Sequence, residues 1–276
     1  MKKILSNIFV LGCLAVALGS CTKEQFLTFD GVKSGIYIQK VAYTTIDGTP
    51  TQYTDSVTFS FTQLKAEDTE YKVNVPVCIM GDTTAFDRPF VLKVDEGAGN
   101  TQRGVHFDFS DSDCVIPAGK AKVNVPVIVK KTDDLGGGEY FRIVLKLADN
   151  EHFTVELKEY KDAAAWNATG NQISGESYKI IYSDIYSSTN TWEWNGKTAL
   201  GEWSASKEKR VNAIMGWTHY DWVMGVPPYG RMGYAAKMLR YELQALADAG
   251  TPVVDDNGEY MQLGAKYLVD YSAYEN

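Results

Sequence analysis

The residues best suited to contact a ligand are tryptophans, which gather in one short part of the chain. Five of the six tryptophans lie between positions 192 and 222. Trp192 and Trp194 would share one face of a strand, because side chains two residues apart in a strand point the same way. Paired exposed indoles can stack on the apolar face of a sugar ring, so this pair is the predicted carbohydrate contact. The alternative is that these rings form the core of a small domain, where aromatic side chains supply much of the buried area.

Acidic turns are the second group of residues with the chemistry of a site. Asp133 and Asp134 follow one expected strand, and Asp108, Asp111 and Asp113 cluster in another turn. Several carboxylates on one loop can hold Ca²⁺. These loops carry fewer acids than calcium-binding loops do. We therefore expect solvated turns and no metal, with calcium as the alternative.

The chain has few residues of the kinds that catalyse reactions. It has only three histidines, His106, His152 and His219, and no Gly-x-Ser-x-Gly, His-Glu-x-x-His or phosphate-loop motif. We therefore predict a protein that is not an enzyme and that carries no cofactor. A glycan hydrolase stays as a third alternative, because the two carboxylates that it needs form no sequence motif of their own.

The amino terminus has the composition of an export signal. Two lysines precede an apolar run from Ile4 to Leu18, and such a pattern is typical of a secretory signal peptide. The run is too short to cross about 30 Å of hydrocarbon as a helix. The residues Leu18-Gly19-Ser20-Cys21 resemble the bacterial lipobox, in which the cysteine is lipidated. This resemblance implies a signal peptide over 1–20, a lipid anchor on Cys21 and a tether over 21–33.

The residues after the anchor indicate which way the protein faces. Thr22-Lys23-Glu24 resembles the Cys-X-Lys-acidic export signal of Bacteroidota surface lipoproteins, although Gln25 stands where a second acidic residue is usual. The resemblance implies a lipid-anchored outer-membrane protein on the extracellular side. The formal charge of −8 excludes nucleic acid as the expected partner, because phosphate binding needs clustered cations.

Cys78 and Cys114 are the two cysteines that remain beside the signal peptide and the anchor. Each lies in an apolar run, and the compartment that the signal peptide implies is oxidising. Two interpretations stay open, which are a pair of buried free thiols and a single disulfide. No Cys/His spacing indicates zinc.

Residues 34–150 have the pattern of a β-sandwich. Apolar and polar residues alternate with the period of half-buried antiparallel strands, and turns bearing Gly, Asp or Pro separate them. The segment Lys72–Val77 recurs letter for letter as Lys122–Val127, which predicts two equivalent hairpins of one sandwich. Proline cannot donate to a strand ladder, so Pro76 and Pro126 are expected at sheet edges or bulges.

The rest of the chain changes character. Residues 151–175 have the composition of a connector, and residues 176–276 that of a smaller α+β domain. Helices are expected at about 206–215 and 232–249, where apolar residues recur at helical spacing and a glycine follows each end. A hairpin is expected over 253–263, around an Asn-Gly turn. The predicted fold class is mainly β, an immunoglobulin-like antiparallel sandwich followed by the α+β domain.

Several short motifs resemble one family of Bacteroidota outer-membrane lipoproteins, the domain-of-unknown-function 4843 type. They are the lipobox, Phe29-Asp30-Gly31 with Ile36-Tyr37-Ile38, a Calx-β-like stretch from Val115 onward, and Leu200-Gly201-x-x-Ser204-x-x-Lys207. The resemblance covers nearly all of the mature chain and supplies no catalytic residues. It implies a non-catalytic binding or accessory role beside SusC/SusD-type glycan-uptake pairs. A surface adhesin or assembly protein, with protein contacts through the sandwich, is the alternative.

Overall fold

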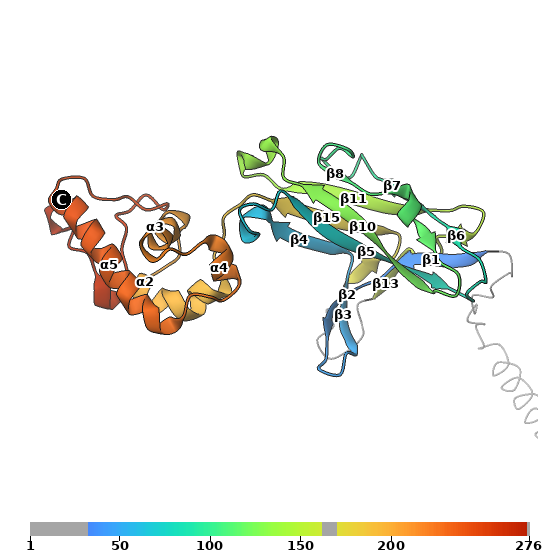
Figure 1. Cartoon of the computed structure of the whole chain (residues 1–276), viewed down its shortest axis with the longest axis horizontal. Helices are drawn as coiled ribbons and strands as arrows, with labels where there is room; N and C mark the ends of the chain where they lie inside the picture. The colour runs from blue at the N-terminus through green and yellow to red at the C-terminus, as the bar shows by residue number, and fades with distance from the viewer. Residues whose placement is uncertain (1–32, 162–169, 275–276) are drawn as a thin grey trace, which may run out of the picture.

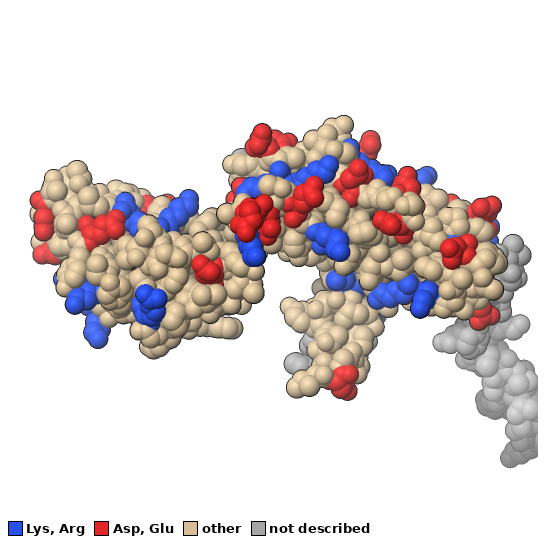
Figure 2. Space-filling model, viewed as in Figure 1, with Lys and Arg blue, Asp and Glu red and all other residues tan. Residues whose placement is uncertain are grey.

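The computed structural model describes residues 33–161 and 170–274. They form a β-rich body that ends at Ser183 and a helical part that begins at Trp192 (Figure 1). On the face shown in Figure 2, acidic and basic side chains are interspersed over the β-rich body. Cys21 with its lipobox lies outside the described residues, and so do residues 162–169 of the expected connector.

Two sheets enclose the core of the β-rich body. The larger has the strand order β12-β1-β5-β10-β8 and the smaller the order β4-β15-β11-β7. The larger sheet consists of β1 (Ser34–Ile38), β5 (Glu70–Met80), β8 (Phe107–Asp108), β10 (Lys122–Lys130) and β12 (Phe153–Thr154). The smaller consists of β4 (Ser56–Ser60), β7 (Val91–Val94), β11 (Phe141–Ala148) and β15 (Ser177–Ser183). Buried side chains from both sheets form one apolar cluster, so the predicted mainly β, sandwich-type fold is confirmed.

The alternating pattern of β10 shows why the sequence predicts this body. Val125, Val127 and Val129 are fully buried, and the residues between them are half-buried. Side chains of a strand point alternately to its two faces, so every second residue meets the core. Most neighbouring strands are antiparallel, as expected, whereas β12 and β4 pair in parallel with β1 and β15.

The two copies of the repeated segment lie on β5 and β10, which pair with each other. Val75 lies opposite Val125, and each proline lies opposite an asparagine of the other copy, as in the pair Pro76 and Asn124. Both strands have a neighbour on each side in the larger sheet. The expectation that the two prolines lie at sheet edges or bulges is therefore wrong.

The position of each proline explains why an inner strand accepts it. The carbonyl of Pro76 accepts a hydrogen bond from the backbone N–H of Gln39 at 3.2 Å, one residue past the end of β1. The N–H and C=O of a strand residue point to the same side, so the missing donor faces the place where the β1 ladder has ended. Pro126 is placed likewise, since β8 pairs with β10 only from Ile128 onward. Neither proline removes a bond between β5 and β10.

The strand β15 shows where the sandwich ends. It pairs with β11 and β4, so it belongs to the smaller sheet rather than to the C-terminal part. Its alternate residues are fully buried in the core of the β-rich body: Tyr178, Ile180 and Tyr182. The predicted domain boundary at residue 176 is therefore too early, because this strand completes the core that the earlier strands leave open.

Three two-stranded ribbons complete the β-rich body. A hairpin of β2 (Lys40–Thr44) and β3 (Pro50–Thr54) projects from it (Figure 1). The other pairs are β6 (Arg88–Pro89) with β9 (Val115–Ile116), and β13 (Glu159–Lys161) with β14 (Gln172–Ser174). Short 3₁₀ helices are η1 (Phe61–Gln63), η2 (Asp111–Asp113) and η3 (Asp133–Gly137).

The C-terminal part is helical. It contains a π-helical turn, η4 (Trp192–Gly196), then α2 (Lys197–Leu200), α3 (Ala205–Met215), α4 (His219–Val223) and α5 (Tyr229–Asp248), with the 3₁₀ turns η5 (Ala265–Tyr267) and η6 (Ser272–Tyr274). The two expected helices are confirmed as α3 and α5. Of the hairpin expected over 253–263, the structure has one bridge, between Val254 and Tyr260. This segment returns along the helices with little strand pairing.

Cys78 and Cys114 are buried free thiols, which decides between the two interpretations of the cysteines. Burial, together with the nearby carboxylates of Asp111 and Asp113, raises the pKa of the Cys114 thiol to about 11. Among the residues that the structure describes, no helix has the length and apolar character needed to span a bilayer.

Candidate functional site

The structure places Trp192 and Trp194 on opposite sides of a helical turn. Trp192 is fully buried, and its indole N–H donates to the carbonyl of Gly201 at 3.1 Å. Its ring packs against Trp222 with 5.0 Å between ring centroids. Trp194 is 77 % exposed. The predicted paired platform is therefore wrong, because residues two apart share a face in a strand but not in a helix.

Basic side chains of the same body contact the acidic turns. Arg103 contacts the carboxylates of Asp108 and Asp111 at 3.1 and 3.0 Å, and its hydrogen bond lowers the pKa of Asp108. Asp134 lies 3.0 Å from Nε2 of His106. Within residues 33–161 and 170–274, no three metal-ligating side chains of His, Cys, Asp or Glu converge.

The helical part has a cleft of about 640 Å³ between the start of α3 and the returning C-terminal segment. We call it the helical-domain cleft. Its walls combine aromatic and hydrogen-bonding side chains, which include Trp203, Lys207, Asp255, Asn257, Glu259 and Tyr260. Sequence reasoning missed this cleft, because its two walls are about 50 residues apart in the chain.

The element Leu200-Gly201-x-x-Ser204-x-x-Lys207 builds one wall of the helical-domain cleft. Leu200 is fully buried, and Gly201 has φ of +80°, where a side chain would also lie 3.2 Å from the carbonyl carbon of Leu263. Ser204 caps α3 by accepting from the backbone N–H of Lys207 at 3.1 Å. A turn that only glycine suits, followed by a helix cap, sets the path of this wall.

Lys207 joins the two walls. It is only 3 % exposed, and its ammonium donates to the carbonyl of Glu202 at 2.7 Å and pairs with Asp255 at 3.4 Å. The neighbouring Asp256 accepts from both the backbone and the hydroxyl of Ser206 at the start of α3, and these bonds lower its pKa. These contacts use two cleft carboxylates to hold the walls together.

Two side chains of the helical-domain cleft remain available to a ligand. Asn257 and Glu259 are exposed, and a 3.4 Å contact joins the Asn257 amide to the Glu259 carboxylate. They flank Gly258, whose φ of +85° makes the turn. The cleft thus offers an amide and a carboxylate beside two aromatic rings.

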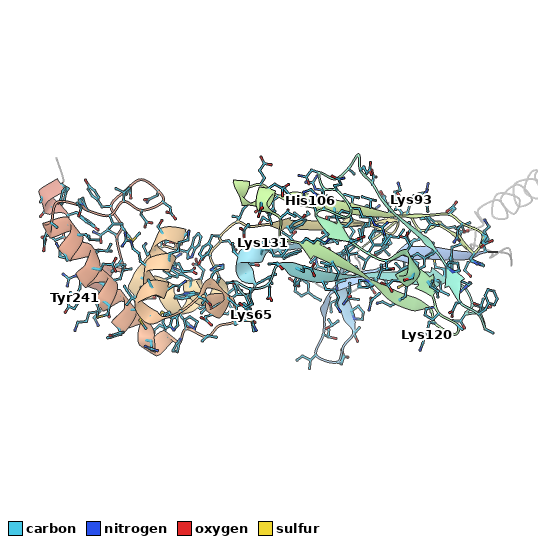
Figure 3. The ribbon with its side chains drawn as sticks, turned by 45° about the horizontal axis from the view of Figure 1, so that its top comes forward. Lys65, Lys93, His106, Lys120, Lys131 and Tyr241 are labelled. Carbon is cyan, nitrogen blue, oxygen red and sulfur yellow. The ribbon has the colours of Figure 1, made fainter. Side chains whose placement is uncertain are left out.

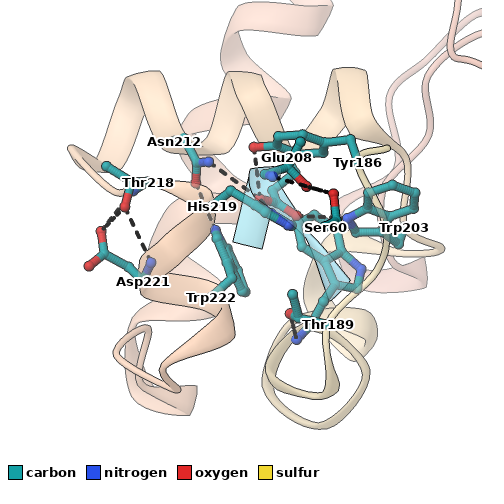
Figure 4. Close-up of polar contacts among 12 residues, drawn as sticks. Ser60, Tyr186, Thr189, Trp203, Glu208, Asn212, Thr218, His219, Asp221 and Trp222 are labelled. Atoms are coloured by element: carbon teal, nitrogen blue, oxygen red, sulfur yellow. Dashed lines mark hydrogen bonds and ion pairs between the residues drawn. The ribbon is translucent and has the colours of Figure 1, made fainter. Parts of the chain in front are cut away.

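A buried carboxylate is bonded to Trp203, one of the residues that line the helical-domain cleft (Figure 4). Glu208 is fully buried and accepts hydrogen bonds from the indole of Trp203 at 2.7 Å and the hydroxyl of Tyr186 at 3.2 Å. Nδ1 of His219 lies 2.7 Å from the same carboxylate. Burial and the charge of Glu208 raise the pKa of Tyr186. This network fixes the orientation of the Trp203 ring that lines the cleft.

Comparison with known proteins gives a family match for most of the chain. The model described as "Domain of unknown function (DUF4843)" matches residues 32–217. No curated protein matches. The matched range includes the sandwich and the Leu200–Lys207 wall of the helical-domain cleft.

Three solved structures from Bacteroides are similar over about half of the chain. One, a "putative carbohydrate binding protein" from Bacteroides ovatus, has 10% identity and a TM-score of 0.32 over 56% of this chain and 38% of its own. A two-domain protein of unknown function from Bacteroides fragilis has 14% identity and a TM-score of 0.29, over 56% and 46%. The third is EndoBT-3987 of Bacteroides thetaiotamicron with Man5GlcNAc product. It has 13% sequence identity and a TM-score of 0.28, over 52% of this chain and 32% of its own. The chain spans less than half the length of each, and these scores are too low to establish a shared fold.

Proposed function

The chain belongs to the DUF4843 family, a domain of unknown function. We propose that it is a surface-anchored, non-catalytic protein that binds carbohydrate in the helical-domain cleft. One observation carries this proposal, which is that Trp203 and Tyr260 line the same cleft as the exposed Asn257 and Glu259. Sugars present apolar ring faces to aromatic side chains and hydroxyls to amides and carboxylates. A volume of about 640 Å³ is in the range of small-molecule sites.

The contacts within the helical-domain cleft favour binding over hydrolysis. Glycan hydrolysis needs two carboxyl groups that flank the bond to be broken. Asp255 pairs with Lys207, Asp256 bonds to Ser206, and Glu202 pairs with Lys197 at 2.9 Å. Among the described lining residues, Glu259 is the only carboxylate that neither forms an ion pair nor bonds to the start of a helix. One unpaired carboxylate suits recognition of sugar hydroxyls.

Replacing Glu259 by alanine is expected to weaken glycan binding about tenfold or more, because a hydrogen bond to a charged group contributes about 1.5–3 kcal/mol. Calorimetric titration against a panel of oligosaccharides measures the change. Glu139→Ala, an exposed glutamate of the β-rich body, is the matched control and should bind like the unchanged protein. Equal affinity of the Glu259→Ala variant would contradict the proposed site.

The proposed anchor is a lipid on Cys21, and the proposed setting is a glycan-uptake system of the SusC/SusD type at the outer membrane. Both rest on the lipobox and the family resemblance in the sequence. A tethered binding protein would hold glycan near such a transporter. Several acyl chains on one residue would keep it at the bilayer.

Changing Cys21 to alanine is expected to move the protein from the membrane fraction to the soluble fraction, because the lipid would have no attachment site. Fractionation and immunoblotting measure the distribution. The Cys13→Ala variant changes a cysteine within the signal peptide and should stay with the membrane. A Cys21→Ala protein that still sediments with membranes would rule out the anchor.

A second candidate function is protein contact through the projecting β2–β3 hairpin. Tyr43 is 64% exposed and Ile46 at its tip is fully exposed. The hairpin stands away from the sandwich (Figure 1), and exposed apolar side chains on a projecting element are typical of protein contacts. This hairpin is where an adhesin or assembly role would be sought.

A further inference from the structure

A second cleft lies where the β-rich body meets the helical part. It has a volume of about 480 Å³, and we call it the junction cleft. Its lining includes Leu64, Lys65 and Lys131 from the β-rich body. It also includes Tyr186 from the segment between β15 and η4, and His219 and Tyr220 from α4. Figure 3 shows Lys65 and Lys131 beside the junction, and Lys93 and Lys120 well away from it.

Hydrogen bonds and an ion pair hold the segment that follows β15 against the β-rich body. The hydroxyls of Ser60 and Thr62 both donate to the carbonyl of Ile185 at 2.9 Å. Lys131 pairs with Asp184 at 3.2 Å. The segment that leaves the sandwich is thus held against η1, so the cleft is pre-formed, as ligand sites usually are.

His219 has a buried nitrogen without a partner. Its Nδ1 lies 2.7 Å from the Glu208 carboxylate, so that nitrogen has a hydrogen-bond partner. The imidazole is 6% exposed, and its Nε2 makes no hydrogen bond to any described residue. Buried polar atoms are rarely left unsatisfied, so a partner for this nitrogen is to be expected.

The two clefts differ in charge. Among the described lining residues, the junction cleft has Lys65 and Lys131 against one carboxylate, Glu67, whereas the helical-domain cleft has four carboxylates and one lysine. Lys131 shares its charge with Asp184, but Lys65 forms no ion pair with a described residue. Its ammonium lies 6.0 Å from the centre of the Tyr220 ring. An unpaired cation beside an aromatic ring favours a ligand that has both a carboxylate and a ring.

We propose that the junction cleft binds an acidic sugar of the uronic acid class. The sugar carboxylate pairs with Lys65, the sugar ring packs beside Tyr220, and a sugar hydroxyl bonds to Nε2 of His219. A ligand with both a carboxylate and hydroxyls satisfies the free cation and the unpartnered nitrogen together. This site is separate from the helical-domain cleft and does not depend on it.

Matched probes test the charge that this site requires. An oligogalacturonide should bind in calorimetric titration, and its fully methyl-esterified form should bind about tenfold more weakly or worse, because it lacks the carboxylate. Lys65→Gln should reduce binding of the acidic form by a similar factor. Lys120→Gln, at a remote exposed lysine, should leave it unchanged. Equal binding of the two probes, or an unchanged affinity in Lys65→Gln, would overturn the proposal.

A spectroscopic measurement tests the part of His219 without mutating a buried residue. With ¹⁵N-labelled histidine, the Nε2 resonance of His219 should shift when the oligogalacturonide is added, and those of His106 and His152 should not. A binding event without this shift would overturn the placement in the junction cleft. The Glu259→Ala variant should keep its uronate binding, so failure of one site is distinguishable from failure of the other.

Discussion

Replacing Trp192 by alanine is expected to lower the free energy of unfolding by about 3–5 kcal/mol, the usual cost of removing a large aromatic side chain from a core. The ring is fully buried among the apolar residues of the helical part and packs on Trp222. Its removal leaves a cavity and also frees the carbonyl of Gly201. Urea denaturation followed by circular dichroism measures the change.

The neighbouring Trp194→Ala variant is the control, because its ring is 77% exposed. Surface substitutions usually change stability by less than about 0.5 kcal/mol. If Trp192→Ala lost as little free energy of unfolding as Trp194→Ala, the burial of Trp192 would be contradicted and the paired platform would regain support.

Replacing Glu208 by alanine is expected to lower the free energy of unfolding by at least about 1–3 kcal/mol, the cost of leaving one buried hydrogen-bonding group without a partner. The change removes the acceptor of His219, Trp203 and Tyr186 at once. The imidazole of His219 would then be buried without this partner, and the half-buried Trp203 and Tyr186 would lose theirs. Thermal and urea denaturation measure the loss.

Two further variants separate the network from the charge of Glu208. Glu208→Gln keeps one oxygen acceptor, so it should lose less stability than Glu208→Ala. Glu202→Ala removes an exposed glutamate six residues away in the chain and should change stability little. If the Glu208→Ala protein unfolds like the unchanged protein, this network contributes nothing to the stability of the fold.

The sequence predicts elements whose evidence is local. Alternation along Lys122–Lys130 predicts a buried face, and glycines after two apolar runs predict where α3 and α5 end. The Trp192–Trp194 spacing is ambiguous, because side chains two residues apart share a face only if the segment is a strand. The structure has a helical turn there, begun by the bond from the backbone of Trp192 to the Thr189 hydroxyl.

The rest depends on contacts between distant parts of the chain. The parallel pairing of β15 with β4 joins residues more than 120 positions apart, so no local pattern assigns that strand to the sandwich. Likewise, Lys207 and Asp255 meet only after the C-terminal segment has returned along α3. Even the Leu200–Lys207 motif, visible as a family resemblance, gave no sign of the cleft that it builds.

The pairing of the two identical segments in β5 and β10 has a consequence for aggregation. A six-residue sequence that forms an antiparallel ladder with its own copy can do the same with the copy in another molecule before folding is complete. Pro76 and Pro126 limit this hazard, because each withholds a donor on the side away from its partner. The free side of a mispaired strand therefore offers fewer hydrogen bonds to a further strand. The prolines thus act like the gatekeeper residues that flank apolar strands and limit aggregation. The prolines that the folded sheet tolerates thus protect the chain while it is still unfolded.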